Sequence, residues 1–132
     1  MKKKRIVISG AGIGGLAAAL CLIQRGFEVI VLEQANELKA VGAGLQLSAN
    51  ATRVLYGIGV GAELEKLSIK PSEKLIRLWN TGQSWKLFDL NAESLERYGH
   101  PYMMLSRPDL HGVLVKALAE RAPGALRDPP RT

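Results

Sequence analysis

The chain has 132 residues, of which 47% are hydrophobic and 23% charged, a composition typical of one small globular domain. Its net charge of +6 does not indicate a nucleic-acid partner, because four of the positive charges cluster at residues 2–5 and the others are scattered singly. The single cysteine, Cys21, excludes an internal disulfide and favours a cytoplasmic protein.

A glycine-rich motif after the first predicted strand is the most informative feature of the sequence. The β-branched residues at 6–8 predict a short strand over residues 6–9, and residues 16–23 have the apolar spacing of a helix. Between them, Gly10, Gly12 and Gly15 have the Gly-x-Gly-x-x-Gly spacing. In such a loop the first glycine forms a tight turn, the second lets the backbone approach a diphosphate, and the third lets the helix pack closely against the sheet. The helix N-terminus then offers N–H groups and a positive dipole end to the phosphates.

A second predicted strand, residues 29–32, leads directly into the acid Glu33. Gly26 lies before it, where the preceding helix needs a left-handed residue to end. An acid at the carboxyl end of this strand is placed to accept hydrogen bonds from an adenosine ribose, and it would repel the 2′-phosphate of NADP. The sequence therefore predicts an α/β protein with the βαβ start of a Rossmann-like parallel sheet, which binds an adenine dinucleotide.

The N-terminus also has features of a secretory signal peptide, since the basic residues 2–5 precede an uncharged run at residues 6–23. That run is rich in glycine and alanine, which makes it weakly hydrophobic for an export signal and a poor membrane span. Export also gives no reason for a strand that ends on Glu33. The nucleotide-binding interpretation is favoured, and no membrane span is predicted.

The next part of the chain predicts an extended segment and two short helices. The glycines of residues 41–47 indicate close approach of the backbone to a ligand or to another strand. Ser48 and Asn50 are candidate N-caps of a helix that reaches Tyr56, and residues 61–67 predict a second helix.

A small antiparallel hairpin insertion is predicted next. Residues 74–80 and 83–89 alternate as two strands around a turn, which would bring Trp79 and Trp85 close together. The polar residues 91–99 are expected to form a loop or a frayed turn.

The last predicted elements are a strand at residues 102–105 and a helix that Ser106 caps, with Pro108 in its first turn. The apolar face of this helix comprises Leu110, Leu114, Ala117 and Leu118. Residues 127–132 contain two prolines, which lack the N–H that an interior strand needs, so an irregular tail is expected there.

The sequence offers no pattern for other chemistry. His100 and His111 have no cysteine or carboxylate at the spacing of a zinc site, and neither a Gly-x-Ser-x-Gly elbow nor a Cys–His signature occurs. Neither a metal site nor a catalytic residue is therefore predicted.

Four segments, taken in order, resemble the N-terminal part of the FAD-dependent aromatic-ring monooxygenases. They are the glycine loop at residues 10–15, Glu33, residues 42–52 and residues 105–110. The resemblance is strongest to the salicylate hydroxylase and 3-hydroxybenzoate 6-hydroxylase branch. It covers the chain from Arg5 to about residue 126.

The resemblance implies FAD as the cofactor, with its diphosphate in the glycine loop and its adenosine ribose on Glu33. It further implies that the segment around Gly44 and Gln46 passes beside the flavin, and that Arg107 reaches the phosphate or ribityl region. The forked donors of a guanidinium suit phosphate oxygens, whereas pairing with Asp109 is the alternative for Arg107. For Gln46, a role without a ligand is an equal alternative. The predicted cofactor-binding residues are Gly10, Gly12, Ile13, Gly14, Gly15, Glu33, Gln34, Gly44, Gln46 and Arg107.

By the same resemblance, full-length relatives are oxidoreductases that use NAD(P)H and oxygen to hydroxylate an aromatic small-molecule substrate, with the flavin carrying the chemistry. The chain is expected to comprise a basic leader at residues 1–5, a partial FAD-binding domain at 6–126 and an irregular tail at 127–132. It is expected to be a truncated or frame-disrupted member, or a partial gene product.

Family members continue into Asp-Gly and Gly-Asp motifs and a substrate-binding sheet, and neither motif occurs in this sequence. The isolated chain is therefore expected to lack hydroxylase activity and to bind FAD weakly or not at all. Two alternatives remain at this stage: the nucleotide-binding fragment of another FAD-dependent oxidoreductase, such as an amine oxidase, and a non-catalytic remnant.

Overall fold

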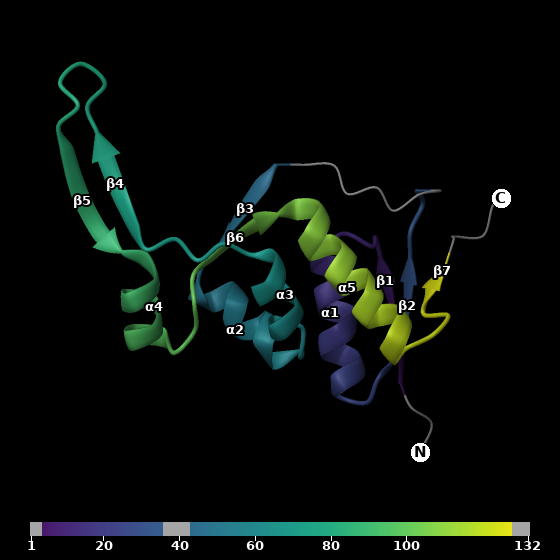
Figure 1. Ribbon diagram of the computed structural model, residues 1–132. Helices are drawn as coiled ribbons and strands as arrows, with labels where there is room; N and C mark the ends of the chain where they lie inside the picture. Colours follow the sequence, from purple (N-terminus) through teal and green to yellow (C-terminus); the bar gives the residue numbers. More distant parts are fainter. Residues whose placement is uncertain (1–3, 36–42, 128–132) are drawn as a thin grey trace.

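A parallel βαβ unit begins the fold in the computed structural model, which describes residues 4–35 and 43–127 (Figure 1). Strands β1 (Arg5–Ser9) and β2 (Glu28–Leu32) pair in parallel, and helix α1 (Ile13–Gln24) connects them. Strand β7 (Leu126–Arg127) pairs in parallel with the other edge of β2, so the strand order is β1-β2-β7. The predicted Rossmann-like start with a parallel sheet is confirmed.

Helix α1 ends in the way that its glycine predicts. Gly26 has a φ of +84°, and its N–H donates to Ile23 O at 2.9 Å, while the N–H of Phe27 donates to Leu22 O at 3.1 Å. These two bonds form a Schellman motif, which pairs carbonyls that the helix itself leaves without donors. The chain is thereby turned back toward β2.

The second part of the fold lies between two strands that pair with each other. Strands β3 (Gly44–Leu47) and β6 (Met103–Ser106) form an antiparallel pair. The elements between them in the chain are α2 (Ala49–Gly57), α3 (Gly61–Leu67), β4 (Glu73–Arg77), β5 (Ser84–Asp89) and α4 (Leu90–Tyr98). The β4–β5 hairpin projects away from the helices (Figure 1), and every residue of both strands is exposed.

Helix α5 (Arg107–Arg121) packs along α1 and carries much of the core (Figure 1). Its predicted apolar face is confirmed, since Leu110, Leu114, Ala117 and Leu118 are all buried. Ser106 caps it as predicted, with its Oγ accepting the N–H of Asp109 at 3.1 Å. The α1 side of this contact is formed by the buried residues Leu16, Ala19 and Leu20. Burial of this stripe fixes α5 against the first βαβ unit.

Two expectations about the hairpin and its neighbour are wrong. Trp85 lies opposite Ile76, whereas Trp79 lies in the turn beyond the paired residues and is 94% exposed. The predicted strands ran longer than the hydrogen-bonded ladder, so the cross-strand partner was misassigned. The two indoles therefore do not form the expected cross-strand pair.

Residues 91–99 do not form the expected loop, because α4 covers Leu90–Tyr98 and ends at Gly99, whose φ is +70°. Its polar side chains are used in tertiary hydrogen bonds. Asn91 donates to Pro71 O at 2.9 Å, and the buried Ser94 donates to His100 O at 2.7 Å. Its large apolar residues Leu95 and Tyr98 are 51% and 63% exposed, so the helix is attached through polar contacts and not through a buried apolar stripe.

Arg127, which the sequence assigned to the irregular tail, is the second residue of β7 and lies opposite Leu32 of β2. The prolines lie further on, in residues 128–132, outside the described ranges. Within the described ranges, no helix has both the length and the apolar character required to cross a membrane.

Candidate cofactor-binding site

The glycine loop forms a tight turn between β1 and α1. Gly10 has a φ of +96°, and its N–H donates to Leu32 O of β2 at 2.7 Å. A Cβ at Gly15 would lie deep inside van der Waals contact with Gly10 O and 3.4 Å from the side chain of Ile8. The structural roles predicted for the first and third glycines, the turn and the close helix packing, are confirmed.

The surface beside Gly12 and Gly14 is open. A Cβ at either position would meet no atom within 4 Å, and both residues are exposed. Gly12 is the N-cap of α1, where no side chain caps the helix, and the first turn contains no acidic residue. An uncapped helix start with free space in front of its N–H groups fits a diphosphate.

Glu33 reaches back to this loop from the end of β2. Its Oε2 accepts the N–H of Ala11 at 2.7 Å, and its Oε1 accepts the N–H of Ala35 at 2.9 Å. A carboxylate oxygen has room for a second donor, so each oxygen keeps acceptor capacity for a ribose hydroxyl. The predicted acid is thus adjacent to the loop that would hold the diphosphate.

These backbone hydrogen bonds stabilise the charged form of Glu33. The N–H groups of Ala35 and then Ala11 lower the pKa of the Glu33 carboxyl below its ordinary value of 4.5, with a smaller contribution from the field of His111. Glu33 is therefore a carboxylate at neutral pH, the form that accepts hydrogen bonds from hydroxyl groups.

His111 also contacts this loop, a role that the sequence analysis does not predict. Its side chain is buried, and its Nε2 lies 2.7 Å from Ala11 O. A carbonyl oxygen only accepts, so Nε2 carries the hydrogen of this bond. One available signal was its position four residues after Arg107, which places both residues on the same face of a helix.

Arg107 begins α5, at the junction between β6 and the helix. Its backbone N–H donates to Ala43 O at 3.2 Å, and its neighbour Ser106 pairs with Gly44 of β3. Its alternative partner, Asp109, is instead engaged with Ser106, whose Oγ donates to Asp109 Oδ2 at 2.5 Å. The structure therefore brings Arg107 and Gly44 together.

The positions of the remaining predicted residues neither require nor exclude a contact with the cofactor. Gln46 in β3 accepts a hydrogen bond from the Tyr102 hydroxyl at 2.7 Å, a protein partner for its side-chain oxygen. Ile13 starts α1 and packs against the core, and Gln34 follows Glu33 with an exposed side chain. A Cβ at Gly44 would meet only Leu105 O, at 3.8 Å, so packing alone does not require glycine there. The cofactor contacts of all these residues stay predictions.

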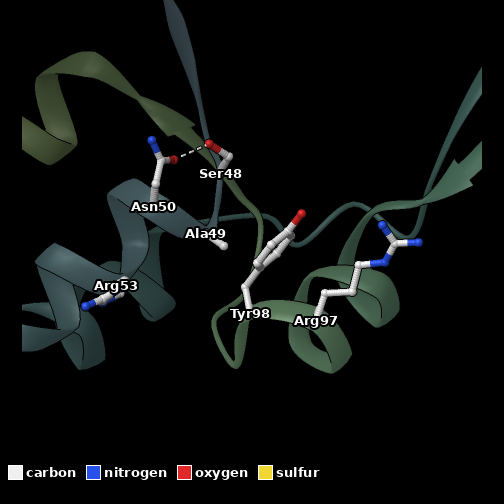
Figure 2. Close-up of a pocket in the computed structure, with 6 residues that line it drawn as sticks. All are labelled: Ser48, Ala49, Asn50, Arg53, Arg97 and Tyr98. Atoms are coloured by element: carbon white, nitrogen blue, oxygen red, sulfur yellow. Dashed lines mark hydrogen bonds between the residues drawn. The ribbon is translucent and has the colours of Figure 1, made fainter.

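A separate hollow lies between α2 and α4, with a volume of about 610 Å³ (Figure 2). Ser48 and Asn50 line one side and are hydrogen-bonded to each other at 2.5 Å. Arg53 and Arg97 point away from one another, and Arg97 pairs with Glu93 at 2.8 Å (Figure 2). Because the two guanidinium groups do not converge, this hollow does not form an anion site.

Taken together, the parallel βαβ unit, the open glycine loop and the acid at the end of β2 define a dinucleotide-binding domain of the Rossmann type. The profile of a family described as "FAD binding domain" matches residues 3–128. The chain belongs to this FAD binding domain family, and FAD is its cofactor.

The relatives are aromatic hydroxylases. The chain is 43% identical over 115 residues to 3-hydroxybenzoate 6-hydroxylase 1 of Aquipseudomonas alcaligenes, covering 85% of this chain and 28% of the relative. It is 37% identical over 125 residues to 3-amino-4-hydroxybenzoate 2-monooxygenase PtnB3 of Streptomyces platensis, covering 95% of this chain and 31% of the relative.

A solved structure has the same fold. The tetrameric form of 2-methyl-3-hydroxypyridine-5-carboxylic acid oxygenase matches with a TM-score of 0.81 and 30% identity, over 97% of this chain and 32% of that one. The chain therefore spans about a third of the length of the proteins it matches, and the match confirms the resemblance found in the sequence.

The two glycines at the start of α1 provide a matched test of the loop geometry. Gly15→Ala is expected to lower the free energy of unfolding by about 3 kcal/mol, because its Cβ cannot coexist with Gly10 O. Gly14→Ala is expected to raise it by up to about 1 kcal/mol, because its Cβ enters open space and alanine favours a helix over glycine. Urea unfolding of both variants measures the difference, and equal destabilisation would contradict the close packing at Gly15.

Glu33→Gln is expected to lower the free energy of unfolding at neutral pH. Folding lowers the pKa of Glu33, so its contribution is complete above the ordinary value of 4.5 and is lost as the pH falls through the lowered pKa. The stability difference between wild type and variant should therefore shrink to nothing in acid.

Urea unfolding over a series of pH values measures this. The control is Glu28→Gln at the other end of β2, where the exposed pair with Arg5 contributes little. A difference for Glu33→Gln that is the same at all pH values would show that the carboxylate charge is not involved.

Proposed function

We propose that the chain supplies the FAD-binding part of a monooxygenase that hydroxylates an aromatic small molecule with NAD(P)H and oxygen. The observation that carries this proposal is the open, uncapped start of α1 beside the carboxylate of Glu33, in a chain of the FAD binding domain family. The names of the hydroxybenzoate relatives support an aromatic substrate.

Within this proposal each part of the site has a distinct task. The diphosphate of FAD lies in the free space beside Gly12 and Gly14, and the adenosine ribose donates to Glu33. Arg107 donates to the phosphate or ribityl region, since it starts α5, the helix whose His111 contacts Ala11 of the glycine loop. The segment with Gly44 and Gln46, next to Arg107, passes beside the flavin.

When bound, FAD supplies the redox chemistry between NAD(P)H and oxygen, and the protein supplies binding and orientation. The task of this chain is then to hold the ADP half of FAD and to orient one side of the flavin. We further propose a cytoplasmic protein, which its single cysteine favours, with no nucleic-acid partner, because its basic residues do not form a stripe.

Cofactor binding tests the assignment of Arg107. The glycine loop and its contact with Glu33 are formed in this chain, so of the two outcomes that the sequence left open, weak binding of FAD is the one expected in equilibrium dialysis of the full chain. Arg107→Ala is expected to raise the Kd about thirtyfold. This factor corresponds to about 2 kcal/mol for a lost hydrogen bond to a charged group. Arg77→Ala is the matched control, because Arg77 lies on the projecting hairpin (Figure 1). An unchanged Kd for Arg107→Ala would remove Arg107 from the site.

An activity assay tests whether this chain, which corresponds to about a third of each relative, is enough for the hydroxylation reaction. The purified chain with FAD, NAD(P)H and 3-hydroxybenzoate is expected to show no substrate-dependent consumption of NAD(P)H, because it corresponds to only about a third of each relative. A full-length hydroxybenzoate hydroxylase is the positive control. Product formation coupled to NAD(P)H consumption would show that this third suffices for the reaction.

A further inference from the structure

Ala11 is hydrogen-bonded on both sides of its backbone. Its N–H donates to Glu33 Oε2 at 2.7 Å, and its carbonyl accepts from His111 Nε2 at 2.7 Å. Ala11 itself is 1% exposed. The two partners come from different parts of the fold, the end of β2 and the second turn of α5, and His111 lies 100 residues from Ala11 in the sequence.

The bond from His111 has a consequence for the next N–H group. All described peptide bonds are trans, and in a trans peptide the C=O and the following N–H point in opposite directions. When His111 holds Ala11 O toward α5, the N–H of Gly12 is turned away from α5. Gly12 has no Cβ to restrict its backbone, so an external constraint is needed to fix the direction of this N–H.

We propose that His111 is a positioning residue for cofactor binding, which orients the Ala11–Gly12 peptide so that the Gly12 N–H faces the diphosphate. The inference rests on the proposed placement of the diphosphate beside Gly12 and Gly14. His111 acts through the backbone of Ala11 and does not contact the cofactor.

The position of His111 on α5 extends this role. Arg107 lies four residues earlier, on the same side of the helix, and is the residue proposed to bind the phosphate or ribityl region. The hydrogen bond from His111 therefore joins the loop to the helix that carries Arg107. The glycine loop and Arg107 are thereby held in one arrangement before the cofactor binds. This reduces the conformational entropy that is lost on binding.

The test uses the full chain with two substitutions at His111. His111→Gln keeps an N–H donor on a flexible side chain of similar reach, whereas His111→Leu keeps the volume and removes the donor. The matched control is His100→Leu, because His100 is the chain's other histidine and its ring packs with Tyr56, 5.8 Å between centroids.

Two readouts separate positioning from general stability. Amide hydrogen exchange without ligand is expected to be faster at Ala11 and Leu16 in His111→Leu, because their N–H groups donate to Glu33 Oε2 and to Gly12 O and are protected only while the loop is held. The amides of β2 are expected to be unchanged, and His111→Gln is expected to be near wild type. Equilibrium dialysis is expected to show an FAD Kd raised about tenfold in His111→Leu, and within about threefold of wild type in His111→Gln and His100→Leu.

Several outcomes would overturn the proposal. An unchanged exchange rate and Kd in a folded His111→Leu would show that the bond does not orient the loop, and equal losses in both His111 variants would show that the donor is not what matters. If His111→Leu does not fold, His111→Gln decides alone, since faster loop exchange in that variant contradicts the proposal. If wild type does not bind FAD, the proposed function of this chain fails, while the exchange comparison still decides the role of His111.

Discussion

The structure depends on how one buried peptide segment is held at the turn between β1 and α1. Glu33 accepts the N–H of Ala11, and His111 donates to its carbonyl. These two bonds join the end of β2 and the start of α5 to the same residue. Because Ala11 is almost fully buried, leaving either backbone group without a partner would be costly. The loop geometry is therefore a property of the assembled domain and not of the glycine motif alone.

The glycines of this loop have two different roles: some allow close packing, and the others leave open space. At Gly15 a side chain would collide with the backbone of Gly10, so the glycine allows α1 to start directly against the turn. At Gly12 and Gly14 a side chain would meet nothing, so packing does not explain these glycines. Open space in front of uncapped helix N–H groups is what a diphosphate requires. The loop thus serves the fold at Gly10 and Gly15, and it leaves open space at Gly12 and Gly14 for the diphosphate that we propose.

The sequence correctly predicted the elements that depend on nearby residues in the chain. Its predictions were wrong for elements that depend on contacts with distant residues. The βαβ start and the apolar face of α5 follow from periodicity, and Gly26 ends α1 as predicted. Helix α4 was missed because Asn91 and Ser94 use their polar side chains in hydrogen bonds to distant backbone groups. The pairing of Arg127 was missed because it depends on the free edge of β2, which composition does not reveal.

The amino-acid pattern by itself determined the class of the protein, because a glycine loop, a helix and a strand that ends on an acid must place the loop and Glu33 at one end of a parallel sheet. It also indicated the FAD-dependent family, which the matched family profile confirms. Only the tertiary structure decided that His111 completes this loop. A contact across 100 residues leaves no periodic trace in the chain, since it arises only when α5 packs against α1 and brings the imidazole to Ala11.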